Sequence, residues 1–343
     1  MKVIPISHGS LYHQRTRNLP SVKTKFAPSM CKFPWSQINI DNEGFIFLCA
    51  CDAWLPFAVG HILDFNSIDE IFSSPVAQEI QQSITDGNYK FCDTNNCFMN
   101  KGENLNDRLY RLYDCSIHLG IDASCNLQCP SCRPRMIFHD DDEYLKERHE
   151  WIDRIRSWIV QRPELKFLVT VGANGEPFAS VLYRQFFATE FNPNVQYYIR
   201  SNATLIKKYI TDLKLLPNLR IIEISLDAAS APVYEKVRNP GKWRTVVDNI
   251  DYLVELKKKY GFHMNASFVI QQQNLDDVLP FVDFCNERDI EPSFNLLQDW
   301  ASFKDYRSEC VHFPESPRYQ EFLNIIHTEK FLSSRPHWIE NYK

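Results

Sequence analysis

Three closely spaced cysteines offer the most direct chemistry in this sequence. Cys125, Cys129 and Cys132 follow the pattern C-x3-C-x2-C within the segment that begins at Asp122. Three thiolates can hold a four-iron cluster and leave one iron without a protein ligand. The open iron can chelate a small molecule and pass it an electron, which a site closed by four cysteines does not allow.

Two other uses of these thiols compete with the cluster. Six residues separate Cys132 from His139, so three thiolates and one imidazole are available for a structural zinc site. A disulfide framework is disfavoured, because 11 cysteines is an odd count and the chain is far longer than a typical stapled domain. Residues 1–26 carry scattered Lys, Arg and Pro without an apolar core, so we expect no signal peptide.

Composition is that of an ordinary globular protein. The chain has 343 residues, of which 44% are hydrophobic and 24% charged, and its formal net charge is −5. This balance indicates no general attraction to nucleic acid or to anionic lipid. The most apolar stretch, residues 45–60, is too short to span a bilayer. We therefore expect a soluble, cytoplasmic protein without a nucleic-acid or membrane partner.

Beyond Cys132 the chain alternates between strand and helix patterns. Strands are predicted at 116–121, 166–171, 195–199, 220–226, 264–270 and 293–297, and helices at 143–160, 178–190, 203–215, 243–260 and 275–288. Such alternation predicts an α/β fold with parallel strands joined by crossover helices. In that fold ligands collect at the carboxyl ends of the strands.

Polar motifs stand at the ends of successive predicted strands. Gly172-Ala-Asn-Gly-Glu-Pro follows the second strand, Ser201-Asn-Ala the third, and Ser225-Leu-Asp-Ala the fourth, with Arg238 further on. Together with the cysteines, these motifs resemble those of the radical S-adenosylmethionine (SAM) superfamily. Its Gly-Gly-Glu-Pro motif has a glycine where this chain has Asn174, and its Thr-Asn-Gly and Ser-Leu-Asp-Gly segments resemble the other two.

The resemblance implies a partial (βα)6 TIM-like barrel and a SAM-binding 4Fe-4S cluster on Cys125, Cys129 and Cys132. It also implies that SAM is bound by Glu176, Asn202, Ser225, Asp227 and Arg238. A carboxylate at Glu176 can accept bonds from the methionine ammonium group, and the Arg238 guanidinium is a natural partner for the SAM carboxylate. Ser225 is expected to contact the ribose end.

The segment before the barrel carries a second group of cysteines. Cys31, Gly44 and Cys49 form the pattern C-x12-G-x4-C, and Cys92 and Cys97 form C-x4-C. This arrangement resembles the SPASM or shorter twitch domain, a small β-hairpin-plus-helix unit that holds an auxiliary 4Fe-4S cluster. The resemblance makes these four cysteines its ligands, with Cys51 as a substitute, and a closed zinc site is the alternative. The family usually carries this domain after the barrel, whereas here it comes first.

The implied activity is that of an oxidoreductase-type radical SAM enzyme. It would cleave SAM to a 5'-deoxyadenosyl radical and abstract a substrate hydrogen, with flavodoxin or ferredoxin as electron donor. We expect oxidation or cross-linking of a peptide. The alternatives are an epimerase or dehydrogenase acting on a peptide, sugar or nucleotide-sugar, with Cys310 as hydrogen donor, and a non-enzymatic iron-sulfur or zinc scaffold.

The sequence thus predicts four segments. Residues 1–26 form a lead-in, 27–110 a SPASM/twitch-like domain, 111–300 the radical SAM partial barrel, and 301–343 a tail with a short helix. Of the remaining cysteines, Cys285 continues an apolar helical stripe with Val278 and Phe281, so we expect it in the core, as we do Cys115.

Overall fold

The computed structural model describes residues 31–49, 55–93, 97, 112–334, 336 and 339–342, so the predicted lead-in at 1–26 lies outside the described residues. The chain divides into two compact units. Unit 1 comprises Met1–Ala123, His139–Asn174 and Val181–Tyr197, and unit 2 comprises Ser124–Phe138, Gly175–Ser180 and Tyr198–Lys343. Strand β6 (Val195–Ser201) passes from unit 1 into unit 2.

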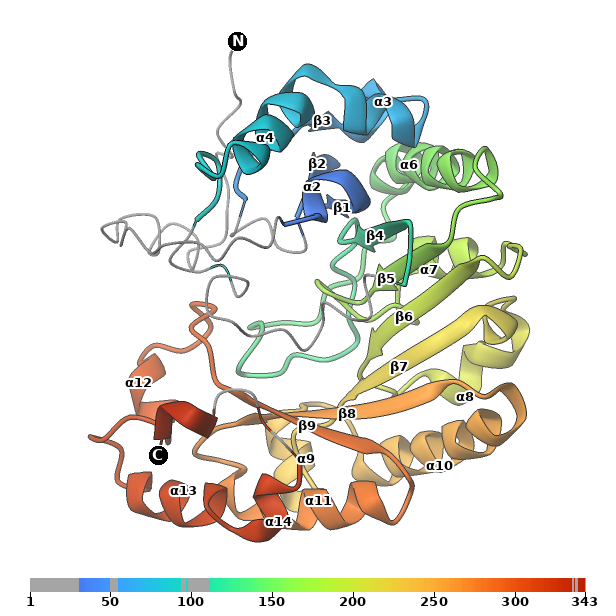
Figure 1. Cartoon of the computed structure of the whole chain (residues 1–343). Helices are drawn as coiled ribbons and strands as arrows, with labels where there is room; N and C mark the ends of the chain where they lie inside the picture. The colour runs from blue at the N-terminus through green and yellow to red at the C-terminus, as the bar shows by residue number, and fades with distance from the viewer. Residues whose placement is uncertain are drawn as a thin grey trace. The chain divides into compact units, whose positions relative to one another are not determined.

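Unit 1 contains three strands joined by antiparallel pairing, two further strands parallel to the first of these, and the helices that accompany them (Figure 1). Its helices begin at capping residues that the sequence supplies: the Ser67 and Ser74 hydroxyls accept from Glu70 N and Ala77 N, and the Asp141 carboxylate accepts from Glu143 N and Tyr144 N. Its elements are α2 (Phe33–Ser36), β1 (Gln37–Ile40), β2 (Phe45–Phe47), β3 (Gly60–His61), η1 (Ile62–Asp64), α3 (Ile68–Ser73), α4 (Pro75–Thr85), β4 (Cys115–Leu119), α6 (Asp142–Val160), β5 (Phe167–Val171) and α7 (Val181–Phe187).

The hairpin belongs to the same sheet as the parallel strands of unit 1. Strand β1 pairs antiparallel with β2 and parallel with β4, and β4 pairs parallel with β5. One face of these three strands is apolar and buried, with Ile38, Ile117 and Val169 in one register row and Ile40, Leu119 and Val171 in the next. Trp151, Ile155 and Trp158 of α6 are also buried, which completes an apolar core for the unit.

Unit 2 continues the alternation of strands and helices. Strand β7 pairs parallel with β8, and β8 pairs parallel with β9. The core at β8 and β9 is aromatic, since the rings of Phe268, Phe281 and Phe294 lie 5.0 to 5.6 Å apart between centroids. Its elements are α8 (Ile206–Tyr209), η3 (Ile210–Asp212), η4 (Leu216–Asn218), β7 (Leu219–Ser225), α9 (Ala231–Val237), α10 (Trp243–Tyr260), β8 (His263–Ile270), η5 (Leu275–Asp277), α11 (Val278–Asn286), β9 (Glu291–Leu296), α12 (Tyr306–Glu309), α13 (Tyr319–Ile326), α14 (Glu329–Leu332) and η6 (Ile339–Tyr342).

The predicted α/β fold class is confirmed. The strand order is β3-β2-β1-β4-β5-β6-β7-β8-β9, in which β4 to β9 are the six predicted strands and the sheet ends at two different edge strands, as in an open, partial barrel. The helices predicted at 143–160 and 243–260 are present as α6 and α10. The predicted hairpin and helices also precede β4 in the chain, and β1 pairs with β4 in the same sheet.

Two predicted helices are shorter than their sequence patterns suggest. The pattern at 203–215 gives only α8 and η3, because Ala203 has a φ of 59°, which lies outside the helical region and delays the helix to Ile206. The pattern at 178–190 gives α7 from Val181, because Ala179 N and Ser180 N first form a turn on the carbonyl of Glu176. Both departures occur where the chain leaves a strand end that bears a predicted functional residue.

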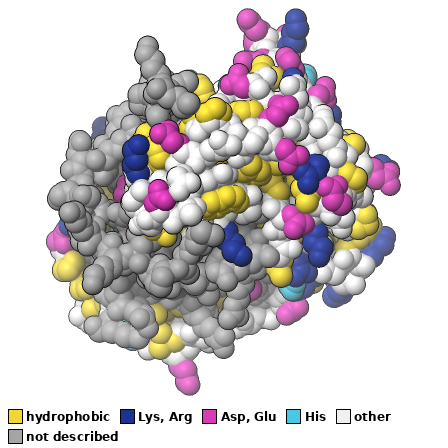
Figure 2. All heavy atoms as spheres, turned by 45° about the horizontal axis from the view of Figure 1, so that its top comes forward, with side chains coloured by type: hydrophobic (Ala, Val, Ile, Leu, Met, Phe, Trp, Pro, Cys, Tyr) yellow, Lys and Arg dark blue, Asp and Glu magenta, His cyan; other side chains and the backbone are white. Residues whose placement is uncertain are grey.

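Charges of both signs are mixed over the described part of the face in Figure 2, without a large area of one sign. This agrees with the small net charge of −5. Among the helices of the described residues, none is long and apolar enough to cross a membrane.

Candidate functional site

The three cysteines of the C-x3-C-x2-C motif lie on one closed loop of unit 2. The backbone N–H of Cys125 donates to the carbonyl of Ile137 at 2.7 Å, and Ile137 N donates back to Cys125 at 3.1 Å. Inside the loop the N–H groups of Cys132 and Arg133 both donate to the carbonyl of Cys129, at 2.9 and 3.0 Å. Cys129 is buried, Cys125 is half-buried and Cys132 is exposed. The loop therefore holds all three thiols in one short, hydrogen-bonded segment.

Each of these sulfur atoms has a side-chain nitrogen donor beside it. Asn202 Nδ2 lies 4.0 Å from Cys125 Sγ, and Arg238 Nη1 lies 3.8 Å from Cys129 Sγ. Arg133 Nε lies 3.4 Å from Cys132 Sγ. Hydrogen bonds to cysteine sulfurs stabilise the negative charge of iron-sulfur clusters and tune their potentials. The sequence predicts Asn202 and Arg238 as contacts of SAM and says nothing of their place beside the sulfurs. Arg133 was not predicted, although its position directly after Cys132 in the sequence could have indicated it.

The donor set fits a four-iron cluster with one open iron. Burial raises the pKa of Cys125 to about 11 and also raises the pKa of Cys129, where Arg238 opposes the shift. Such thiols ionise readily only when a metal compensates the charge, which a cluster does. Within the described residues, no group of three or more His, Cys, Asp or Glu side chains is placed to hold a single metal ion. A cluster bonds each cysteine to a different iron, so its ligands lie further apart than those of one ion.

His139, the fourth ligand of the zinc alternative, belongs to unit 1. Its ring stacks on the ring of Tyr144 with 4.1 Å between the centroids.

Glu176 forms hydrogen bonds with both the start of the cysteine loop and the end of β6. Its backbone N–H donates to the carbonyl of Ser124, at the start of the cysteine loop. Its carboxylate accepts from Ser201 Oγ at 2.8 Å and from Asn202 N at 2.6 Å, and it is 1% exposed. Burial raises its pKa to about 7, against the lowering effect of these hydrogen bonds. Glu176 thus connects the cysteine loop with the end of β6.

Asn202 is fixed by a small polar network at the end of β6. Its Nδ2 donates to Asn126 Oδ1 at 3.1 Å, and its Oδ1 accepts from Thr204 N at 3.0 Å. Thr204 Oγ1 in turn accepts from Asn126 Nδ2 at 2.9 Å. Asn126 and Thr204 were not named from the sequence. The network orients the Asn202 amide toward Cys125.

Arg238 and Asp227 form a buried ion pair with 2.8 Å between Nη2 and Oδ2. Asp227 has a φ of 58° and also accepts from Val269 N at 2.7 Å, so β8 fixes its position. Burial raises the pKa of Asp227, and Arg238 opposes that shift. Arg238 Nε has no hydrogen-bond partner within the described residues. Ser225, the last residue of β7, is half-buried.

The thiols of Cys31, Cys92 and Cys97, which are predicted ligands of the auxiliary site, interact in unit 1. Burial raises the pKa of Cys92 to about 12, and the thiols of Cys31 and Cys97 raise it further. The same three thiols add to the effect of burial on the pKa of Tyr89, which is also raised. Cys49 is buried two residues beyond β2, and Cys51 lies outside the described residues.

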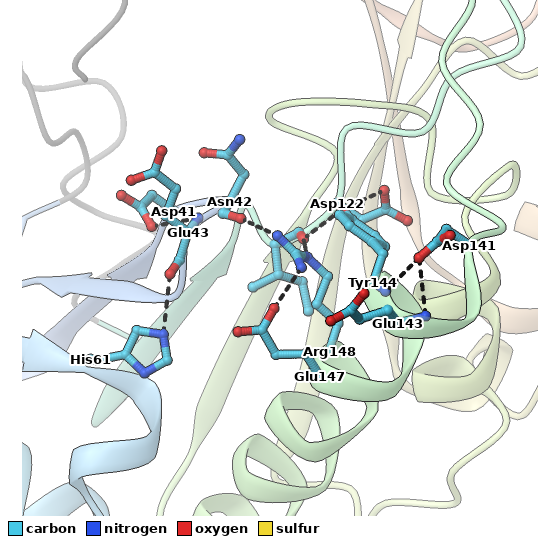
Figure 3. A network of polar contacts seen from close by, with 11 residues as sticks. Asp41, Asn42, Glu43, His61, Asp122, Asp141, Glu143, Tyr144, Glu147 and Arg148 are labelled. Carbon is cyan, nitrogen blue, oxygen red and sulfur yellow. Dashed lines mark hydrogen bonds and ion pairs between the residues drawn. The ribbon is translucent and has the colours of Figure 1, made fainter.

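Arg148 of α6 ties the hairpin turn of unit 1 to the end of β4 (Figure 3). Its Nη2 donates to the carbonyl of Asn42 at 2.8 Å, and its Nε donates to the carbonyl of Ile121 at 3.3 Å. The guanidinium lies 3.6 Å from the centroid of the Tyr144 ring. On the other side of the turn, His61 Nε2 lies 3.1 Å from the carbonyl of Glu43. The turn that contains Gly44 is therefore held from two directions.

The remaining cysteines are buried in the part of the chain that the structure describes. Cys115 starts β4 and Cys285 lies on α11, both at 1% exposure or less. Cys310 is also fully buried, and its Sγ donates to the carbonyl of Tyr306 at 3.3 Å.

A comparison with curated proteins finds no match for this chain. Among protein families, residues 123–285 match the radical SAM superfamily, and residues 31–98 match SPASM, an iron-sulfur cluster-binding domain. The two matches together take in the cysteine loop, the strand-end motifs and the N-terminal cysteines.

Several solved structures are similar at low identity. SuiB of Streptococcus suis is 15% identical over 80% of this chain and 61% of its own, with a TM-score of 0.42. TYW1 with a lysine-pyruvate adduct is 15% identical over 59% of this chain and 69% of its own, with a TM-score of 0.38. The methyltransferase TsrM from Kitasatospora setae is 14% identical over 53% and 35%, with a TM-score of 0.37.

This chain spans 44% to 61% of the length of the SuiB chains that it matches. The family identification therefore rests on the two domain matches and their order along the sequence. The chain belongs to the radical SAM superfamily and carries an iron-sulfur cluster-binding SPASM domain before its radical SAM domain.

Proposed function

We propose that this protein reductively cleaves SAM and uses the radical formed for oxidative modification or cross-linking of a peptide. The observation that carries the proposal is the closed loop on which Cys125, Cys129 and Cys132 each have a nitrogen donor near the sulfur. This loop lies within the segment that matches the radical SAM superfamily.

The cofactors follow from the two domains: a 4Fe-4S cluster and SAM in the radical SAM domain, and an auxiliary iron-sulfur cluster in the SPASM domain. When bound, the first cluster supplies one electron to SAM, which separates into methionine and a 5'-deoxyadenosyl radical. We assign Cys125, Cys129 and Cys132 to that cluster. For the auxiliary cluster we propose Cys31, Cys49, Cys92 and Cys97.

The residues of the chain would bind and orient SAM. We assign the contacts with SAM to Glu176, Asn202, Ser225, Asp227 and Arg238. Arg238 has a guanidinium nitrogen without a partner in the described residues, which supports its assignment to the SAM carboxylate. Asp227 keeps that guanidinium in place through the ion pair. Glu176 holds the cysteine loop and the β6 end at a fixed spacing.

Oxidation is favoured by the predicted second group of cysteine ligands. In such a reaction the substrate would lose a hydrogen atom to the deoxyadenosyl carbon, then one electron and one proton as a new bond forms, which is a two-electron oxidation. An auxiliary cluster held by the SPASM domain would accept that electron. Three thiols that interact electrostatically, those of Cys31, Cys92 and Cys97, support this assignment.

Anaerobic protein given dithionite and SAM should release 5'-deoxyadenosine and methionine, which chromatography measures. The triple replacement of Cys125, Cys129 and Cys132 by Ala should abolish the release, and Cys285→Ser, a core substitution, should not. A protein that carries intact clusters but forms no 5'-deoxyadenosine would refute the proposal and support the scaffold alternative.

The reaction outcome is tested in deuterium oxide with a peptide substrate. A product two mass units lighter is expected for oxidation. A product one unit heavier, with deuterium at a stereocentre and lost in Cys310→Ala, would instead establish an epimerase. The burial of Cys310 and its bond to Tyr306 support the first outcome, because the thiol would have to become accessible to donate hydrogen.

We also propose flavodoxin or ferredoxin as the electron donor, a cytoplasmic location, and domain boundaries at residues 27–110 and 111–300. Limited proteolysis that cuts first near residue 110 would support the boundary.

A further inference from the structure

The second face of β1, β4 and β5 in unit 1 is mostly polar, whereas a core would be apolar. Side chains alternate along β1, β4 and β5, so Gln37, Ser116 and the apolar Leu168 share one register row. Asn39, His118 and Thr170 share the next row. Strands buried on both faces usually carry apolar residues on both. Here four of these five polar side chains are buried: Gln37, Ser116, His118 and Thr170.

Two of these buried side chains have no partner in the part of the chain that the structure describes. Both Nε2 and Oε1 of Gln37, which is 1% exposed, lack a hydrogen bond. The hydroxyl of Thr170, which is 2% exposed, also lacks one. Buried polar groups are nearly always paired, because leaving water without a new partner costs free energy. A polar ligand that bonds to both groups would remove this cost.

The two unpaired groups are too far apart for one water or one small molecule. Gln37 and Thr170 are two strands and two residues apart, so their Cα atoms are separated by about 12 Å, given strand spacings of about 4.8 Å and a rise of about 3.3 Å per residue. An extended peptide covers that distance with about four residues. The ligand is therefore expected to be elongated.

The chemistry of this face selects an uncharged ligand with both donors and acceptors. A carboxamide presents one donor and one acceptor side by side, which matches the N–H and C=O of a single extended residue. A hydroxyl adds a second site of either kind. Gly120 and Gly172 directly follow β4 and β5, and a Cβ at Gly120 would lie 2.8 Å from Asn174 Nδ2. The chain beyond this end of β5 enters the segment Gly172-Ala-Asn, which precedes Glu176 in the sequence.

We propose that Gln37 and Thr170 bind backbone amides of an extended peptide substrate along this face of β1, β4 and β5. The site determines specificity, because side chains that hydrogen-bond to backbone amides favour uncharged ligands that carry amides over charged ligands. The inference rests on the proposed function only for identifying this ligand as the substrate.

Stability measurements test whether the groups are unpaired. Replacing an unpaired buried polar group by an apolar one of similar shape removes a cost, so Gln37→Leu and Thr170→Val should raise the unfolding midpoint by about 1 to 3 °C each. The matched controls remove paired groups: Gln81 donates to the carbonyls of Pro34 and Phe72, and the Thr328 hydroxyl accepts from Phe331 N. Gln81→Leu and Thr328→Val should lower the midpoint. Lower midpoints in all four variants would overturn the proposal.

Binding is tested with the cluster-loaded full chain and two neutral probes of similar length. Saturation-transfer NMR should show binding of trialanine blocked by acetyl and N-methylamide groups. The Gln37→Leu/Thr170→Val double variant should bind it about ten-fold more weakly or worse, because two hydrogen bonds are lost. Maltotriose is the second probe.

Equal trialanine binding by the parent and the double variant would overturn the proposal, as would maltotriose binding that depends on these two residues without trialanine binding. These outcomes are independent of 5'-deoxyadenosine release, so failure of this inference can be told from failure of the proposed function.

Discussion

Replacing Gly44 by Ala should destabilise unit 1 far more than the same change at another glycine. Gly44 lies in the turn between β1 and β2, with a φ of 82°, a conformation that favours glycine. A Cβ there would overlap His61 Nε2 and lie 3.0 Å from Trp151 Cη2. Both rings are held in place, His61 by Leu63 N and the Glu43 carbonyl, and Trp151 by burial at 1% exposure.

The magnitude is the sum of two effects. The left-handed conformation costs an L-residue about 1–2 kcal/mol. Ala also lowers the conformational entropy of the unfolded chain, which stabilises the folded state by about 0.4–1 kcal/mol. Displacing the His61 ring costs about 1–3 kcal/mol for overpacking and about 1 kcal/mol for its hydrogen bond. We therefore expect Gly44→Ala to lower the free energy of unfolding by about 2–5 kcal/mol.

Gly87 provides the matched control in the same unit. Its φ is 69°, and a Cβ there would meet no atom within 4 Å. Gly87→Ala should therefore show the backbone cost alone, about 0.5–1 kcal/mol. Urea titration of the anaerobic protein gives both values, and hydrogen exchange should show faster exchange at Val59 and Ile62, whose amides bond across the hairpin. Equal losses for Gly44→Ala and Gly87→Ala would refute the steric argument.

Three further predictions concern the candidate site. The triple replacement of Cys125, Cys129 and Cys132 by Ala should lower the iron content by about four atoms per chain, as measured by elemental analysis. The control Cys285→Ser should leave the iron content unchanged. Zinc in the remaining site would contradict our assignment of the auxiliary cysteines. Arg238→Met leaves the Asp227 carboxylate buried without its ion pair and should cost about 3–5 kcal/mol in urea titrations. Adding Asp227→Asn should recover most of that stability but not SAM binding measured by equilibrium dialysis; recovered binding would show that Arg238 does not contact SAM. Burial raises the pKa of Glu176 from 4.5 to about 7. Its contribution to the free energy of unfolding is therefore complete below pH 4.5 and is lost as the pH rises through 7, a change of about 3 kcal/mol in all. Glu176→Gln should lack this dependence when unfolding is measured from pH 4.5 to 8, and parallel profiles for parent and variant would contradict the assigned shift.

Much of the fold was predictable because its signals are local. Each of the six strands β4 to β9 was predicted to within two residues at either end, from short runs with apolar residues that alternate with helix patterns. Helix α9 was not predicted, because its seven residues carry little periodicity. The helix pattern at 203–215 was misleading, since the backbone at Ala203 is set by the packing at the β6 end and not by helix propensity.

The candidate site was predictable in its residue types but not in its contacts. The spacing of Cys125, Cys129 and Cys132 identifies a cluster loop, because ligands on one short loop are set by local chain geometry. Arg238 and Cys129 are 109 positions apart in the sequence, and no local pattern predicts that their side chains come together. The same is true of Asp227, which the family resemblance assigns to SAM and which forms an ion pair with Arg238 in the structure.

The sequence by itself determined the family, the order of its two domains and the residues able to bind iron, since these depend on side-chain chemistry at fixed spacings. Only the tertiary structure decided which strands are neighbours and in which register. That register places Asn39, His118 and Thr170 in one row and leaves Gln37 and Thr170 buried without partners. Pairing between distant strands depends on the packing of the whole unit, and no local pattern encodes it.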